Sequence, residues 1–306
     1  PRFVVPLHGL GVTLRAMGRH EEAVVPLKRA VDIIRNSDGL HAPSQLPILR
    51  ALIACYQLTD RPDDATREHQ YAYSIAEQLW GGDDPRMIPV LEEFAGWYET
   101  IGRHASARLM YSRAVQLADK EQPMSIKAVP ALRGLARNYR LGFIHGDNEH
   151  GVMVPADELP ESLRRYAPVS GGPPSTAEGE RALRNALQRL GPAGPTHAAE
   201  RGAVMVDLGD WYRIAGLTDR ALAMWRDAWG QLKLAEDTPL LARPEPLVYR
   251  APPVATSQRK PDPEEYDVQE VELRMAIGAD GSVREVTVSN PAPERESAER
   301  KRADHR

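Results

Sequence analysis

The stretch LHGLGVTLRAMGRHEEAVVPLKRAVDII, residues 7–34, contains two apolar patterns of helical period on either side of a short polar turn, GRH. In the first part Leu7 and Leu10 begin a series of apolar residues three or four positions apart, and in the second part Ala23 and Ala30 belong to such a series. This spacing places the residues of each series on one face of an α-helix. The stretch therefore predicts two helices that pack antiparallel across a short turn.

The same pattern returns every 42 residues, which relates Ala23 to Ala65 and Ala107. Four further columns keep this register, namely Leu7, Leu49 and Leu91; Leu10, Leu52 and Phe94; Tyr56 and Tyr98; and Ala30, Ala72 and Ala114. Self-similarity at a fixed period is typical of repeat architectures in which each unit packs on its neighbours. We therefore expect a stacked array of helix pairs, with small residues such as Gly11 bringing the two helices of a pair close together.

A fourth and a fifth unit follow, but the fourth is interrupted. Leu132 and Tyr139 repeat the first helix, whereas the matching second helix begins only near Gly179, from where the 42-residue shift leads on to Ala221. We therefore place an insertion at about residues 142–177. Its composition is rich in glycine and proline and predicts loops around a short helix at residues 158–166.

These columns resemble the tetratricopeptide repeat, which has a small residue and a tyrosine on the first helix and an alanine, a bulky residue and an alanine on the second. The 42-residue period and linkers such as GGDDP are similar to the longer repeats of the kinesin light chain type. The resemblance implies an α-solenoid over residues 1–237 whose first helices line a groove for a peptide or protein. Two positions depart from the pattern, since Ile53 replaces the small residue of unit two and His69 replaces its bulky one.

Proline is abundant, with 26 residues, and its positions carry structural meaning. Pro47, Pro89 and Pro130 fall in the first turn of a first helix, where a missing N–H has no cost. Pro26 lies inside a predicted second helix, so we expect it to kink that helix or to delay its start.

A row of arginines marks the first helix of unit four. Arg133, Arg137 and Arg140 share one helix face, and guanidinium groups bind carboxylates or phosphates through paired hydrogen bonds. The neighbouring first helices present further charged residues that complete the predicted groove, namely Glu92, Glu93, Glu99, Asp207, Asp210 and Arg213. Two interpretations stay open at this point: a partner-binding groove, or a lattice of salt bridges between units that keeps the array in solution.

The overall composition excludes several classes of protein. The net charge of −4 gives no basic field for nucleic acid, and no run of 18 apolar residues is present to span a bilayer. Cys55 is the only cysteine, so an intramolecular disulfide and a cysteine-based zinc site are excluded, and we expect a buried, inert thiol. The chain begins with Pro1, so we expect missing upstream sequence, for which a signal peptide and a membrane anchor are open alternatives.

Few side chains suggest chemistry. His145, Asp147, Glu149 and His150 cluster in the insertion and offer metal-ligand types, but their spacing matches no ligand motif, so a solvated loop is favoured. Among the tryptophans, Trp225 lies in the packing column, which favours core filling over a ligand-stacking box. We predict no catalytic residue, no metal and no cofactor.

The last part of the chain has a different pattern. Residues 238–265 are proline-rich and predict an extended linker. Val271 to Ile277 alternate apolar and polar residues, the AspGly turn at 280–281 follows, and Val283 to Val288 form a second alternating stretch, which predicts a β-hairpin before a charged helix. Residues 266–306 resemble the C-terminal domain of TonB-family energy transducers, without its third strand, so we expect a truncated α+β domain.

The sequence thus predicts a mainly α protein, an α-solenoid followed by a small incomplete α+β domain, that acts as a non-enzymatic scaffold for a protein or peptide. The TonB resemblance implies a place in the bacterial periplasm or envelope, while a cytoplasmic location stays open. The alternatives are a TonB-like energy-transducing protein and, with less support, a metal-dependent enzyme using His145 and His150.

Overall fold

The computed structural model describes residues 2–145, 159–164, 166, 176–235, 273–277 and 283–288. The chain divides into two compact units, Pro1–Glu245 and Pro246–Arg306. Each is described by itself.

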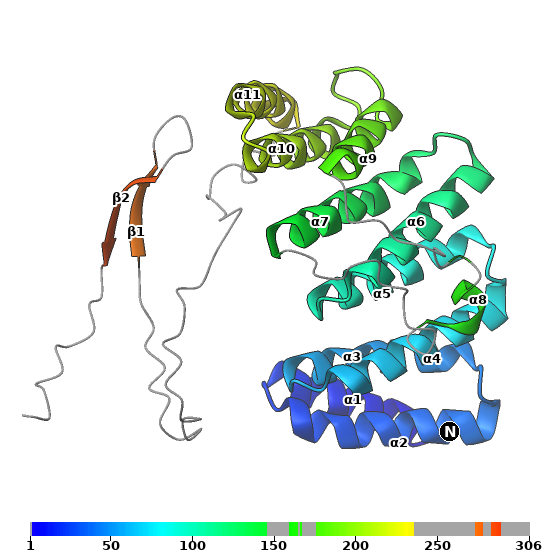
Figure 1. The fold of residues 1–306 in the computed structure, drawn as a ribbon. Coiled ribbons are helices and arrows are strands. Elements are labelled where there is room, and N and C mark those ends of the chain that lie inside the picture. The colour runs from blue at the N-terminus through cyan, green and yellow to red at the C-terminus, as the bar shows by residue number, and fades with distance from the viewer. Residues whose placement is uncertain are drawn as a thin grey trace, which may run out of the picture. The chain divides into compact units, whose positions relative to one another are not determined.

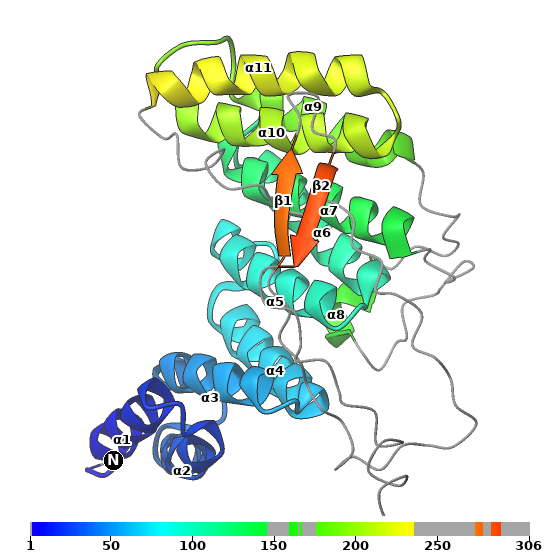
Figure 2. The ribbon, with the colours of Figure 1, turned by 90° about the vertical axis from the view of Figure 1, so that its left-hand side faces the viewer.

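Antiparallel helix pairs build the first unit, and Figure 2 shows them following one another from α1 to α11. The first helices of the pairs are α1 (Val4–Ala16), α3 (Leu46–Leu58), α5 (Ile88–Thr100), α7 (Val129–His145) and α10 (Ala198–Ile214). The second helices are α2 (His20–Asp38), α4 (Pro62–Trp80), α6 (His104–Glu121), α9 (Thr176–Arg189) and α11 (Thr218–Leu234). Single 3₁₀ turns, η1 (Pro43–Gln45), η2 (Pro85–Met87) and η3 (Ile126–Ala128), precede α3, α5 and α7.

The 42-residue register is confirmed by burial. Ala23, Ala65 and Ala107, the column that first revealed the period, are all fully buried. Leu27 packs so closely on Gly11 that a β-carbon on the glycine would lie 2.5 Å from its Cγ. Small residues thus allow the close helix approach that the sequence predicts.

The turn inside each pair repeats as well. Gly18, Gly102 and Gly216 follow a first helix with φ values of 75°, 74° and 77°, and Asp60 takes the same place in unit two with φ 51°. Glycine adopts this left-handed conformation without strain, and aspartate tolerates it better than most other side chains. The turn is therefore set by backbone conformation more than by side-chain packing.

Proline behaves as expected at three positions and differently at a fourth. Pro47 and Pro89 lie in the first turn of α3 and α5, and Pro130 is the second residue of α7. By contrast α2 begins at His20 and continues through Pro26, so the expected delay of its start is wrong. The helix on both sides of Pro26 buries its apolar face, and this packing outweighs the lost hydrogen bond, which costs about 3 kcal/mol.

In the fourth unit, α7 and α9 pack on each other although 30 residues separate them. His145 ends helix α7 and does not lie in a loop as predicted, because the apolar residues Phe143 and Ile144 extend the helical pattern to it. Asp147, Glu149 and His150 lie outside the described residues. The predicted short helix is present but spans only Glu161–Arg164 (α8).

In the second unit, β1 (Leu273–Ile277) and β2 (Val283–Val288) pair antiparallel, with Leu273 opposite Val288 and a register shift between Ala276 and Ile277. The strands fall on the two alternating stretches of the sequence. The charged helix expected after them lies outside the described residues, so the small α+β domain as a whole stays a prediction.

Candidate functional site

The first helices of neighbouring pairs contact one another more than the second helices do. Helix α1 contacts α3, and α7 contacts both α5 and α10, whereas none of the described second helices packs extensively on another second helix. Figure 1 shows α3, α5 and α7 succeeding one another along one side. We call the charged surface of α5, α7 and α10 the first-helix face; its residues are Glu92, Glu93, Glu99, Arg133, Arg137, Arg140, Asp207, Asp210 and Arg213.

Arg137 connects α7 to α5. Its Nε donates to Glu99 Oε1 at 2.5 Å, and its Nη2 donates to the Tyr111 hydroxyl at 3.2 Å. The Tyr111 hydroxyl in turn lies 3.4 Å from Glu99 Oε2. Burial raises the pKa of Tyr111 to about 12, so the phenol stays protonated and acts as a donor.

Arg133 and Arg140 connect α7 to α10. Arg133 Nε donates to Asp207 Oδ2 at 2.6 Å, and Arg140 Nη1 lies 3.4 Å from Asp210 Oδ2. Asp210 also accepts from Trp225 Nε1 at 3.1 Å. Burial raises the pKa of Asp210 to about 6 despite these donors, because the carboxylate loses most of its hydration.

The other three predicted residues are less connected. Burial raises the pKa of Glu92 to about 7, and Glu92 Oε1 has no hydrogen-bond partner within the described structure. Glu93 is exposed and pairs with Arg50 on α3 at 3.4 Å. Arg213 forms no ion pair with any described residue.

The structure thus brings the arginine row together with carboxylates of both neighbouring units, as the salt-bridge interpretation expected. Three arginines meet three carboxylates, so this part of the face carries no net charge. It is still a surface: 49% of the Arg137 side chain is exposed.

The sequence predicts that Tyr111 fills the groove between units, but its contact with Gly134, beside this face, was not predicted. Tyr111 is nearly buried and packs on Gly134 of the next unit, where a β-carbon would lie 2.4 Å from its Cε1. The sequence shows that Tyr111 is the bulky residue of its column and that a glycine, Gly134, follows Arg133. The repeat period does not give the distance between units, so the contact between the two residues could not be predicted from it.

A second polar cluster joins α9 to α10. The Tyr212 hydroxyl donates to Glu180 Oε1 at 3.0 Å, and Arg184 donates to both of these residues at 2.8 Å. Tyr212 belongs to the tyrosine column of Tyr56 and Tyr98, which are fully buried. Both charged partners of the Tyr212 hydroxyl are on α9, the second helix of the preceding unit.

The remaining candidates are structural. Cys55 is buried, and burial raises the pKa of its thiol, which makes it a poor nucleophile. The tryptophans contact different helices: Trp97 donates to Thr66 at 2.9 Å, Trp211 packs on Gly179, and Trp225 packs on Gly209. They form no common ligand box, and the packing role predicted for Trp225 is confirmed.

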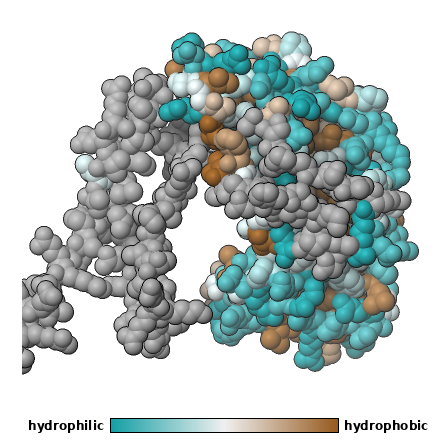
Figure 3. Space-filling model, viewed as in Figure 1, coloured by the Kyte–Doolittle hydropathy of each residue, from teal (hydrophilic) through white to brown (hydrophobic). Residues whose placement is uncertain are grey.

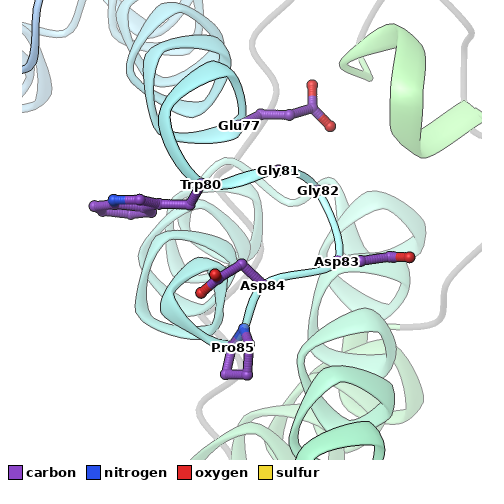
Figure 4. A pocket seen from close by; sticks show the side chains of 7 residues that line it. All are labelled: Glu77, Trp80, Gly81, Gly82, Asp83, Asp84 and Pro85. Carbon is purple, nitrogen blue, oxygen red and sulfur yellow. The ribbon is translucent and has the colours of Figure 1, made fainter.

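A cavity of about 490 Å³ opens at the turn after α4 (Figure 4). Glu77, Asp83 and Asp84 line it, but each carboxylate already has a partner. Asp83 accepts from Lys120 at 2.9 Å and from Arg113, Asp84 pairs with Arg86, and Glu77 accepts from Tyr73.

Within the described residues no group of three or more His, Cys, Asp or Glu side chains is placed to hold a metal ion. The described helices also include none that is long and apolar enough to cross a membrane. The surface of the helical unit in Figure 3 is mostly hydrophilic, with scattered apolar side chains.

The fold and this face define a class, the tetratricopeptide-like α-solenoid, and residues 7–37 match the family model described as tetratricopeptide repeat. No curated protein matches the chain. The family match falls on the first helix pair and gives no support to the TonB-like interpretation of residues 266–306, which stays a prediction together with the periplasmic location.

Solved structures with this fold include a putative kinesin light chain of Podosopora anserina with nearly identical TPR-like repeats. It has a TM-score of 0.54 and 17% identity, over 76% of this chain and 96% of that one. BtubC (BKLC) from P. vanneervenii has a TM-score of 0.51 and 15% identity, over 82% of this chain and 86% of that one. At these identities the likeness concerns the fold alone, and it agrees with the long-repeat type that the 42-residue period indicated.

Proposed function

We propose that this protein is a non-enzymatic scaffold whose first-helix face binds a peptide or protein partner. Tetratricopeptide repeats generally mediate interactions between proteins. The observation that supports the proposal most is the arginine row of α7, which is fixed between α5 and α10 and keeps Arg137 half exposed. Fixed guanidinium groups lose little side-chain entropy when they bind a carboxylate or a phosphate.

The ion pairs indicate which ligand groups can bind to the arginines. A ligand carboxylate or phosphate has to replace Glu99, Asp207 or Asp210 as the acceptor of an arginine. Because the paired face carries no net charge, long-range attraction contributes little, and we expect micromolar affinity with a shallow dependence on salt. Asp210, with a pKa of about 6, would release Arg140 more readily in mildly acidic solution.

The test compares matched charge reversals. Arg133→Glu with Arg137→Glu removes the row, and Arg67→Glu reverses an exposed arginine of the second helix α4 as the control. Proteins that co-purify with the full-length chain are quantified by mass spectrometry. We expect the double variant to lose a set of partners that the control keeps; equal recovery by both variants rules out the first-helix face.

A second experiment separates binding from stability. Arg137→Glu combined with Glu99→Arg reverses the pair and keeps the salt bridge between α5 and α7. If the face acts only as a salt-bridge lattice, this exchange restores everything that Arg137→Glu removes. If the face binds a partner, stability returns and partner recovery does not.

We also propose, on the resemblance of residues 266–306 alone, that the second unit acts in the cell envelope as a TonB-like element. The paired strands β1 and β2 are compatible with it. Fractionation of cells that produce the full-length gene product tests this part: recovery in the cytoplasmic fraction alone contradicts it.

A further inference from the structure

The insertion of unit four returns to the array far from its own helix pair. Leu159 and Leu163 are 2% and 1% exposed and belong to the same apolar cluster as the core of the solenoid. Figure 1 shows α8 beside α4 and α6, on the side of the second helices. This part of the insertion is therefore packed on units two and three.

Polar and aromatic contacts fix the segment at both ends. The hydroxyl groups of Ser162 and Tyr73 on α4 are 3.4 Å apart. The guanidinium of Arg113 on α6 lies 4.3 Å from the ring centroid of Tyr166, a distance typical of a cation–π contact. We call the described residues between 159 and 166 the inserted segment, and the place that it occupies, marked by Tyr73 and Arg113, the outer seat.

Units two and three pack on each other less tightly than their neighbours do. Helix α4 packs less extensively on α5 than α2 does on α3 or α6 on α7. The His69 ring lies at this contact and stacks on Phe94 at 5.2 Å and on Trp97 at 5.8 Å. Unit two also has Ile53 where the other units have a small residue.

The residues that mark the outer seat have further partners besides the inserted segment. Arg113 donates to the Gly82 carbonyl at 3.2 Å and pairs with Asp83, and Tyr73 is also bonded to Glu77 at 3.4 Å. In Figure 4 the Glu77 side chain extends from α4 toward the short green helix, α8. A partner that replaced the inserted segment would meet the same donors and the same apolar floor.

We propose that the outer seat is a second peptide-docking surface, distinct from the first-helix face, and that the inserted segment occupies it as a tethered, exchangeable ligand. The sequence that fits the seat is a short segment with leucines four positions apart, a single helical turn that contains the second leucine, and a tyrosine three positions after it. A helix of four residues has little stability of its own. Its covalent connection to the rest of the chain gives it a high effective concentration at the seat.

The experiment displaces the inserted segment from the outer seat and leaves the residues of the seat unchanged. Leu159→Asp with Leu163→Asp is introduced in the full chain, and binding of a fluorescent peptide of residues 157–168 is measured by anisotropy. We expect at least ~10-fold tighter binding to the double variant than to the natural chain, because the tethered copy no longer competes. A peptide with both leucines replaced by aspartate is the control and should not bind.

Two results overturn the proposal. One is a double variant that keeps its helical circular dichroism and fails to bind the peptide, or binds it no better than the natural chain does. The other is loss of helical structure in the variant, which makes the segment an integral part of the core. Adding Arg113→Ala to the double variant should weaken binding of the peptide. Arg133 and Arg137 stay unchanged in these variants, so a negative result would leave the proposed function of the first-helix face unaffected.

Hydrogen exchange on the natural chain gives a readout without mutation. The Leu163 amide donates to the Pro160 carbonyl at 2.9 Å. If the segment is exchangeable, this amide exchanges faster than the amides of α4 and α6 that it covers. Equal protection contradicts the proposal.

Discussion

At the scale of single residues, close approach between helices depends on glycines that face large rings. Gly134→Ala places a β-carbon 2.4 Å from the ring of Tyr111, which is nearly buried and cannot move away easily. We expect a loss of about 2 kcal/mol in the free energy of unfolding, a typical cost of overpacking. Denaturation in urea, followed by circular dichroism, measures it.

Gly9→Ala is the matched control for this prediction. Gly9 is also helical, but no side chain or neighbouring helix lies within 4 Å of the place that a β-carbon would take there. Alanine should therefore be neutral or stabilise the protein by up to about 1 kcal/mol through helix propensity. A similar loss for both substitutions would show that helix propensity, and not the contact with Tyr111, governs position 134.

His69 gives the array a pH dependence. Burial lowers the pKa of His69 to about 4, and Nε2 has no hydrogen-bond partner in the described structure. The unfolded chain takes up a proton on this ring near pH 6.5, the folded chain only near pH 4. The free energy of unfolding therefore falls by up to about 3 kcal/mol as the pH is lowered between these values.

His69→Leu tests this dependence, because leucine occupies the equivalent position of unit one, Leu27. Between pH 6.5 and pH 4 the urea midpoint of the variant should fall less than that of the natural chain, because leucine takes up no proton. If the two proteins lose stability in parallel over this range, another group carries the acid sensitivity.

At the scale of elements, the interrupted fourth unit depends on one buried arginine. Arg189 of α9 donates to both carboxylate oxygens of Asp119, at 2.6 and 2.8 Å, and to the Ser125 carbonyl at 3.0 Å. Its side chain is 2% exposed. These bonds attach the end of α9 to α6 and to the turn before α7, and so close a pair whose helices are not joined by a short turn.

Arg189→Ala should therefore cost about 3 kcal/mol, since it removes the guanidinium that pairs with Asp119 and the donor of the Ser125 carbonyl. Arg184→Ala on the same helix is the control, because Arg184 is exposed and its pair with Glu180 should contribute about 0.5 kcal/mol. Thermal unfolding of the two variants measures the difference. Equal costs would mean that α9 is held by its apolar face alone.

At the scale of the whole molecule, the sequence predicted what repeats and missed what differs between units. The alanine column, the contact of Leu27 with Gly11 and the delayed second helix of unit four follow from period and residue size. The partners of Arg133 and the position of Leu163 do not, because they depend on distances between units that a period leaves undefined. The candidate groove was therefore predicted as a set of residues, and its pairing was established only by the structure.

The first helix pair differs from the middle pairs because it has different neighbours. Leu10, Leu52 and Phe94 share one column, yet Leu10 is 50% exposed whereas Leu52 and Phe94 are 1% exposed. Units two and three have the second helix of a preceding unit over this column, and α1 has no such helix among the described residues. In a repeat protein the stability of each unit depends on its neighbours.

We therefore expect α1 to open more readily than the central helices. Its backbone amides should exchange at least ~10-fold faster than those of α5 in hydrogen-exchange mass spectrometry. Equal protection of α1 and α5 would mean that something covers the exposed column in solution. A dilution series then identifies the cover: protection that fades on dilution comes from a second molecule, and protection that persists comes from the same chain.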